Sequence, residues 1–196
     1  LKAILLAVLF AAAGILFCVL LHESADLFGK WFPNPYLRVA VGGIAVILLA
    51  LILHTSDYLG LGEAILKDSF VNAQNLERFL LKMIFTCLTL SSGFKGGEIV
   101  PSLFIGATLG SALSSILALP ANLCAGCGMV GVFCAVTNCP VSSMLIAAEL
   151  FGFTGMPYYC VVIAVSYLIS GYKSLYHAQT IVYSKTENKY VNRHIE

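Results

Sequence analysis

Between Met83 and Tyr172 the chain carries only three charged residues, Lys95, Glu98 and Glu149. So long a stretch with so few charges cannot form the surface of a soluble domain, because charged side chains cover such surfaces. The whole chain of 196 residues is 59% hydrophobic and 11% charged, whereas a typical soluble domain is about 25% charged. This pattern predicts an all-α polytopic membrane protein. It argues against a disordered chain, a soluble enzyme and a nucleic-acid-binding surface.

Apolar segments separated by glycine and proline predict a series of helices. We expect them near residues 2–28, 36–54, 62–70, 76–90, 99–117, 123–136, 141–151 and 157–170. Several are shorter than the roughly 20 residues that a membrane crossing needs. Broken helices at membrane depth are tolerated only where the break is buried or lines an aqueous cavity. The two breaks, at residues 96–101 and 137–140, are therefore the places where we look for an ion or substrate site.

Small residues inside the apolar segments predict close packing. Gly106, Ala107, Gly110 and Ala112 form a small-residue face on the helix expected at 99–117, which lets a second helix approach closely. The seven cysteines stand mostly inside apolar runs, as small buried packing residues do. Cys124-x-x-Cys127 has no second pair nearby, so we expect no metal site, and no sequence motif calls for a cofactor.

The break at residues 96–101 has the features of an anion site. Gly96 and Gly97 allow a sharp turn that leaves backbone N–H groups bare. The N–H groups of Glu98 and Ile99, at the start of the next helix, have no intrahelical acceptor, and the helix dipole adds positive partial charge. One helix end contributes at most about 2 kcal/mol, so a working site needs other helix ends or a hydroxyl. An ordinary helix start at a packed turn has the same spacing.

Glu98 favours the functional interpretation. A carboxylate at membrane depth is energetically costly and usually has a function. At a helix start, Glu98 can be stabilised as an anion, or it can take a proton when an anion displaces it, which fits proton-coupled anion movement. The alternative is a structural ion pair with Lys95, three residues earlier. For Glu149, near the end of another apolar helix, we expect a structural, hydrogen-bonded role.

Three segments together resemble the CLC family of chloride channels and anion/proton antiporters. Residues 91–101, followed by 104–110, resemble the third anion-coordinating motif of that family. Residues 137–140, followed by 149–152, resemble its next re-entrant helix pair. Residues 167–171, followed by Leu175, Tyr176 and Gln179, resemble its last transmembrane helix and the tyrosine that starts its C-terminal helix. The resemblance covers essentially the whole chain.

The resemblance implies a role for individual residues. The backbone at Gly97, Glu98 and Ile99 would face a central chloride or fluoride ion, and the Tyr176 hydroxyl would donate a hydrogen bond to it. Glu98 is the candidate for proton coupling. Asn138, just before Pro140, is either a helix cap or a residue that lines the pathway. Helices near 144–151 and 158–170 would form a homodimer interface.

Within the family, residues 94–95, Glu98 and residues 137–138 resemble most closely the bacterial fluoride/proton antiporter branch and its relatives. That branch more usually has Val-Thr where this chain has Ile99-Val100, and Thr where it has Cys139. Chloride and fluoride therefore both remain open, as do channel and antiporter.

The resemblance is to the second of the family's two inverted halves. Neither the serine-bearing motif nor the external gating-glutamate motif of the family is present in residues 1–196. We therefore expect residues 1–196 to be the C-terminal half of a CLC-type transmembrane domain, a fragment that needs the N-terminal half, and we see no cytoplasmic regulatory domain of the nucleotide-binding type in them. The alternative is a non-conducting half-subunit that needs a partner chain.

Two further expectations follow from charge. Lys173, Lys185, Lys189 and Arg193 favour a cytoplasmic C-terminus in a protein of the plasma membrane. A membrane-embedded enzyme would need a nucleophile with its base, or a set of metal ligands. The stretch with few charges offers only Lys95, Glu98 and Glu149 besides cysteine and tyrosine, so we expect no enzyme activity.

Overall fold

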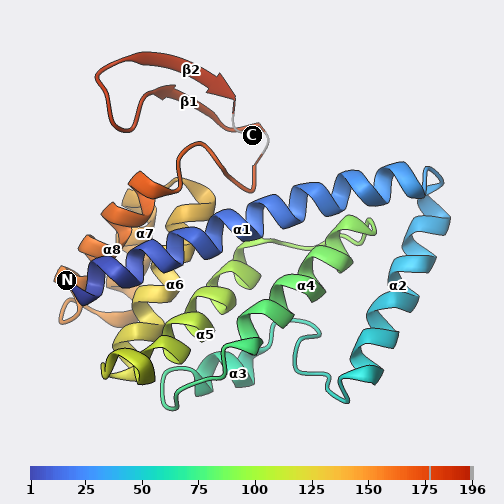
Figure 1. The fold of residues 1–196 in the computed structure, drawn as a ribbon, viewed down its shortest axis with the longest axis horizontal. Helices are drawn as coiled ribbons and strands as arrows, with labels where there is room; N and C mark the ends of the chain where they lie inside the picture. Colours follow the sequence, from blue (N-terminus) through green and yellow to red (C-terminus); the bar gives the residue numbers. More distant parts are fainter. Residues whose placement is uncertain (177, 195–196) are drawn as a thin grey trace.

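The structure, a computed structural model, describes residues 1–176 and 178–194. Within these residues the chain forms eight helices and one pair of strands (Figure 1). The elements are α1 (Lys2–Trp31), α2 (Pro35–Ile52), α3 (Glu63–Asp68), α4 (Glu77–Ser91), α5 (Ile99–Leu117), α6 (Ala121–Thr137), α7 (Pro140–Phe151), α8 (Met156–Ile169), β1 (Thr180–Tyr183) and β2 (Tyr190–His194). Each predicted helix is present, with ends that differ by a few residues, so the predicted helical membrane fold is confirmed.

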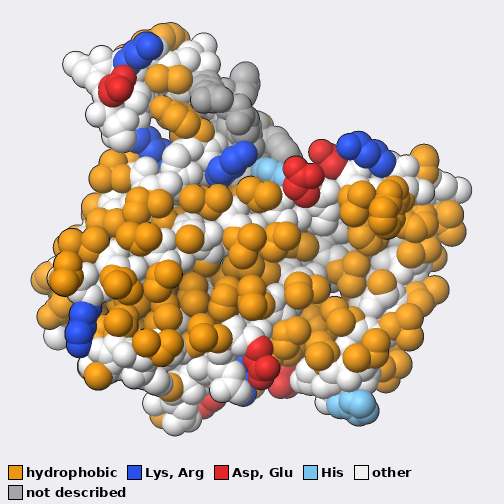
Figure 2. Space-filling model, viewed as in Figure 1, with side chains coloured by type: hydrophobic (Ala, Val, Ile, Leu, Met, Phe, Trp, Pro, Cys, Tyr) orange, Lys and Arg blue, Asp and Glu red, His pale blue; other side chains and the backbone are white. Residues whose placement is uncertain are grey.

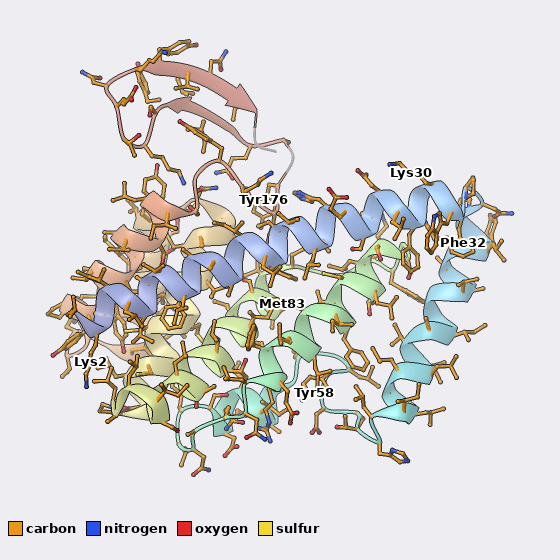
Figure 3. All side chains as sticks on the ribbon, in the orientation of Figure 1. Lys2, Lys30, Phe32, Tyr58, Met83 and Tyr176 are labelled. Carbon is orange, nitrogen blue, oxygen red and sulfur yellow. The ribbon has the colours of Figure 1, made fainter. Side chains whose placement is uncertain are left out.

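Helix α1 packs against several of the other helices. It crosses α4, α5 and α6 in Figure 1 and also packs against α8. Its ends are marked by Lys2 and Lys30 in Figure 3, where Met83 of α4 lies beneath its middle. Phe10 and Phe17 of α1 are completely buried, as is Met83. One continuous helix thus packs against α4, α5, α6 and α8.

Helices α5 and α6 pack with their backbones in contact. A Cβ atom added at Gly106 would collide with the carbonyl of Gly128 and lie 2.9 Å from the Cα of Met129. Gly110 meets the carbonyl of Cys124 in the same way. The predicted close approach through small residues is therefore confirmed, and it determines the position of α5, which follows the glycine-rich break.

The surface is suited to a lipid bilayer. Helices α1, α2 and α5 of the described chain are long and apolar enough to cross a membrane. Helices α6, α7 and α8 are apolar but shorter, with 17, 12 and 14 residues. Figure 2 shows hydrophobic side chains covering the middle of one face, with charged side chains gathered toward its upper and lower margins. An apolar belt between polar margins is the surface that lipid covers.

The tail departs from the sequence analysis. The prediction that Tyr176 starts a C-terminal helix is wrong for the described residues, where β1 and β2 form an antiparallel hairpin. The segment Thr180–Tyr183 is rich in β-branched and aromatic residues, which favour strands. Tyr183 pairs with Tyr190 across the hairpin, and the two rings meet edge to face with their centroids 5.8 Å apart.

Lys185, in the hairpin loop, anchors the hairpin to the helices. Its Nζ donates hydrogen bonds to the Tyr167 carbonyl at 2.8 Å, to the Ser170 hydroxyl at 3.0 Å and to the side-chain oxygen of Asn138. It also lies 4.2 Å from the centroid of the Tyr167 ring. Burial lowers the pKa of Lys185 to about 8, so these contacts offset a desolvation cost.

Replacing Lys185 by Met is expected to release the hairpin. The substitution keeps the apolar stem and removes the three donated hydrogen bonds. Amide hydrogen exchange over residues 180–194 should rise about tenfold, since one net hydrogen bond of about 1.4 kcal/mol corresponds to that factor. Lys189→Met, at an exposed hairpin position, is the control. Equal exchange in the two variants would contradict the anchoring role.

Candidate functional site

The first turn of α5 presents free backbone donors, as the sequence predicts. Glu98 precedes the helix, and its carbonyl accepts the hydrogen bond of Ser102 N–H at 3.1 Å. Within residues 1–176 and 178–194, the N–H groups of Glu98 and Ile99 have no acceptor. A Cβ at Gly97 would meet nothing within 4 Å, so there is open space beside Gly97, next to these donors in the chain.

Glu98 stands at this helix start without a cationic partner. Its side chain is half-buried, and Lys95 is exposed. The ion pairs in the described part of the chain are Lys67–Glu63 and Arg78–Asp68. The structural ion pair between Glu98 and Lys95, considered above as an alternative, is therefore not present in this structure.

The segment that contains Tyr176 is hydrogen-bonded to the end of α6. The Leu175 N–H donates to the Val136 carbonyl at 2.9 Å, and the Ser174 hydroxyl donates to the same oxygen at 3.0 Å. The Gln179 side chain donates to the Thr137 carbonyl at 3.1 Å. These bonds use carbonyls that the end of a helix leaves unpaired, and they hold the segment against the end of α6.

Tyr176 lies within this anchored segment and is electrostatically coupled to Glu98. Burial raises the pKa of Tyr176, and the negative charge of Glu98 raises it further. The side chain is 40% exposed, and its hydroxyl has no hydrogen-bond partner among the residues that the structure describes. Two of the predicted site residues, far apart in sequence, are thus linked by charge, and the Tyr176 hydroxyl is free to donate.

Asn138 has a structural role, because its side chain hydrogen-bonds to several separate parts of the chain. It ends α6 in a left-handed conformation with φ of 56°, so it caps α6 rather than the start of α7, where Cys139 stands. Its side-chain amide donates to the Lys173 carbonyl at 2.7 Å, and its side-chain oxygen accepts from the Ser170 hydroxyl at 3.1 Å. Because Lys185 also donates a hydrogen bond to the side-chain oxygen of Asn138, this side chain connects α6, α8 and the tail.

The expectation for Glu149 is wrong. Its side chain is exposed on α7, and it makes no hydrogen bond within the described residues. The helix turns this position outward, on the same side as the exposed Leu145 and Leu150. A carboxylate two residues before the last residue of a twelve-residue helix can reach the polar margin of the membrane without a protein partner.

No three His, Cys, Asp or Glu side chains of the described chain gather where they could hold a metal ion. The cysteines are free thiols, five of them buried and two half-buried, which confirms their role as packing residues. The candidate site therefore consists of backbone donors, one carboxylate and one hydroxyl.

Sequence reasoning missed a buried cation next to this site. Lys82 of α4 is 2% exposed and borders a cavity of about 550 Å³. The same cavity is lined by Gly96, Gly97 and Pro101 at the start of α5. A lone lysine within the apolar helix expected at 76–90 was the available signal.

The chain matches the family described as voltage gated chloride channel over residues 1–171. It is 38% identical over 184 residues to the chloride/fluoride channel protein of Pseudomonas syringae pv. tomato, a match that covers 91% of this chain and 41% of that protein. It is 29% identical over 142 residues to the putative ion-transport protein YfeO of Escherichia fergusonii, covering 69% of this chain and 34% of that protein.

The fold is similar to a solved structure described as the crystal structure of a CLC-type fluoride/proton antiporter. The TM-score is 0.86 at 35% sequence identity, and the match covers 89% of this chain and 45% of that one. The chain therefore spans less than half the length of each of these relatives. The family match includes the α5 break and all of α1 to α8, so the chain belongs to the CLC family of voltage-gated chloride channels.

Proposed function

We propose that this integral membrane protein forms the C-terminal half of a proton-coupled pathway for small monovalent anions, chloride or fluoride. The observation that carries the proposal is the start of α5, where the N–H groups of Glu98 and Ile99 have no acceptor in the described residues and the charge of Glu98 acts on Tyr176. The names of the relatives, a chloride/fluoride channel protein and a fluoride/proton antiporter, support this anion class.

Each residue of the site has a distinct chemical task in this proposal. Gly97 leaves room for the ion, and the N–H groups of Glu98 and Ile99 donate to it with the help of the helix dipole. The Tyr176 hydroxyl donates a further hydrogen bond. The Glu98 carboxylate competes with the anion for the same positive potential and takes up a proton when the anion displaces it.

The site supplies one helix end and one hydroxyl, which is too little to dehydrate an ion. A helix end contributes about 2 kcal/mol at most, whereas ion dehydration in a low-dielectric medium costs tens of kcal/mol. Transport therefore requires a complementary N-terminal half, consistent with a chain that spans 41% of its relative. The exposed start of α5 also favours a second candidate function, a non-conducting half-subunit that waits for a partner chain.

The membrane placement and assembly complete the proposal. We place the protein in the plasma membrane with its C-terminus in the cytoplasm, where the lysines of the tail would lie. A homodimer would form through 144–151 and 158–170, because α7 and α8 expose Leu145, Leu150, Tyr158 and Leu168 at 66%, 56%, 52% and 49%. The mass of the detergent-solubilised protein, corrected for bound detergent, tests this dimer.

Anion efflux from lipid vesicles tests the function. Vesicles loaded with fluoride or chloride should release the ion when they contain this chain together with a CLC N-terminal half, while external pH reports proton movement. The chain alone should release neither ion. Efflux without a second half would overturn the half-pathway proposal. Absence of efflux with every N-terminal half supplied would leave the half-subunit as the favoured function.

Replacing Tyr176 by Phe is expected to weaken anion binding modestly. The change removes the hydroxyl and keeps the ring, so the loss is that of one neutral hydrogen bond, about 0.5–1.5 kcal/mol. Isothermal titration of the assembled transporter with fluoride and chloride measures it. Tyr183→Phe, in β1, is the matched control. An affinity equal to the parent's would remove Tyr176 from the site.

A further inference from the structure

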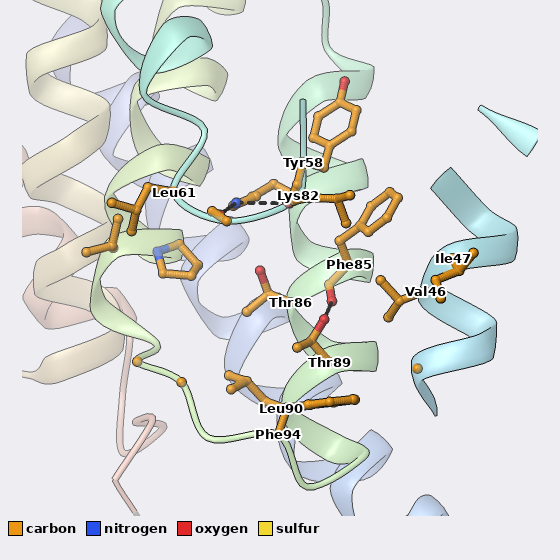
Figure 4. Close-up of a pocket in the computed structure, with 17 residues that line it drawn as sticks. Val46, Ile47, Tyr58, Leu61, Lys82, Phe85, Thr86, Thr89, Leu90 and Phe94 are labelled. Carbon is orange, nitrogen blue, oxygen red and sulfur yellow. Dashed lines mark hydrogen bonds between the residues drawn. The ribbon is translucent and has the colours of Figure 1, made fainter. Parts of the chain in front are cut away.

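The cavity beside α4 has a composition that the anion pathway does not explain. Figure 4 shows its walls, formed by α2, the loop that follows α2, α4 and the start of α5. Apolar side chains make up most of the lining, among them Val46, Ile47, Phe85, Leu90 and Phe94. No aspartate or glutamate lines it. Its volume of about 550 Å³ falls within the roughly 300–1,000 Å³ of small-molecule sites.

Lys82 places an uncompensated positive charge at this cavity. Its Nζ donates to the carbonyls of Gly60 at 2.7 Å and of Tyr58 at 3.2 Å, in the loop that roofs the cavity. It lies 5.1 Å from the centroid of the Phe104 ring, and no carboxylate in the described ranges is within ion-pairing distance of it. Two carbonyls satisfy two of its three N–H donors, and the charge itself has no counter-ion.

Thr86 adds an unused donor one helical turn further along α4. Its side chain is only 8% exposed, yet its hydroxyl has no hydrogen-bond partner in the described part of the chain. In Figure 4 this hydroxyl points into the cavity. Thr89 lines the same cavity, but its hydroxyl already donates to the Phe85 carbonyl at 2.7 Å. The hydroxyl is open to the cavity and is not one of the fully buried polar atoms that lack a partner, so it is available to donate a hydrogen bond to a ligand there.

We propose that this cavity binds a small amphiphilic monocarboxylate. Lys82 and Thr86 lie four residues apart, on one face of α4, and together hold the carboxylate head. The apolar walls hold a hydrocarbon or aromatic body. A single halide would fill only a small part of the volume and would leave the apolar walls without contacts, whereas a carboxylate with an apolar body satisfies both features.

The ligand would also lie close to the proposed anion site. Gly96 and Gly97 line the cavity and lead directly into the first turn of α5, so a bound carboxylate would bring negative charge close to that turn. It would therefore inhibit anion transport, an effect that rests on the proposed function. Binding itself does not, and it is measured without transport, so the two proposals fail separately.

Fluorine NMR of the protein in lipid nanodiscs tests the site. The probe is para-(trifluoromethyl)benzoate, and the uncharged para-(trifluoromethyl)benzyl alcohol is the control for partition into lipid. We expect saturable broadening for the benzoate only. Thr86→Val should weaken its binding about tenfold, the loss of one hydrogen bond to a charged group, and the matched Thr89→Val should leave it unchanged.

Lys82→Met should remove the preference for the carboxylate over the alcohol, and the exposed Lys67→Met should keep it. Because Lys82→Met also removes two hydrogen bonds to the roof loop, Thr86→Val carries the decision. Equal binding of benzoate and alcohol by the parent protein would overturn the proposal. An equal affinity of the Thr86→Val and Thr89→Val variants would do the same.

Discussion

Replacing Glu98 by Gln in the assembled transporter should lower proton flux about 100-fold, the contribution that one positioned proton-transfer group typically makes. Anion flux should change much less. Glutamine keeps the size of the side chain and leaves the N–H groups of Glu98 and Ile99 in place. It removes the only carboxylate at the start of α5, where no cation pairs with it in the described chain.

The experiment measures both ions in the same vesicles, with an anion-selective electrode and a pH electrode. Glu149→Gln is the matched control, since Glu149 is an exposed carboxylate on α7 with no part in the proposed pathway. An unchanged ratio of protons to anions in Glu98→Gln would remove Glu98 from the coupling mechanism. An equal fall of both fluxes would show that the variant harms the anion site itself.

A sequence reading finds the helices because hydropathy and helix breakers act locally. Pro35, Pro140 and Pro157 each stand in the first turn of an observed helix, the position where proline is best tolerated. The glycine-rich break behaves in the same way. Gly96 and Gly97 precede α5, which begins at Ile99 as expected, so the free donors of the candidate anion site follow from the sequence alone.

The features of the site that could not be predicted from the sequence depend on tertiary contacts. Glu149 and Lys82 both lie among apolar residues of their helices, yet one is exposed and the other is 2% exposed. The difference comes from the loop after α2, whose carbonyls cover Lys82. Likewise, the position of the segment at Tyr176 depends on carbonyls at the end of α6, about 40 residues earlier, which no local pattern reveals.

Replacing Gly106 by Ala should destabilise the fold, although helix propensity alone predicts a gain of about 1 kcal/mol. The added Cβ would collide with the carbonyl of Gly128 and lie 2.9 Å from the Cα of Met129. Both neighbours are backbone atoms of α6, so the clash is relieved only if two helices separate. We therefore expect a net loss of about 2 kcal/mol or more in the free energy of unfolding.

The matched control is Gly97→Ala, the same chemical change two residues before α5. A Cβ at Gly97 meets nothing within 4 Å, so its stability should stay within about 0.5 kcal/mol of the parent. Thermal unfolding in detergent, followed by circular dichroism, compares the two, with an expected fall of about 4 °C or more for Gly106→Ala. A midpoint at or above that of the parent would contradict the backbone contact between α5 and α6.

Because that contact sets where α5 begins, a confirmed loss of stability in Gly106→Ala should be accompanied by weaker anion binding. Gly97→Ala is expected to affect the anion site without affecting the fold.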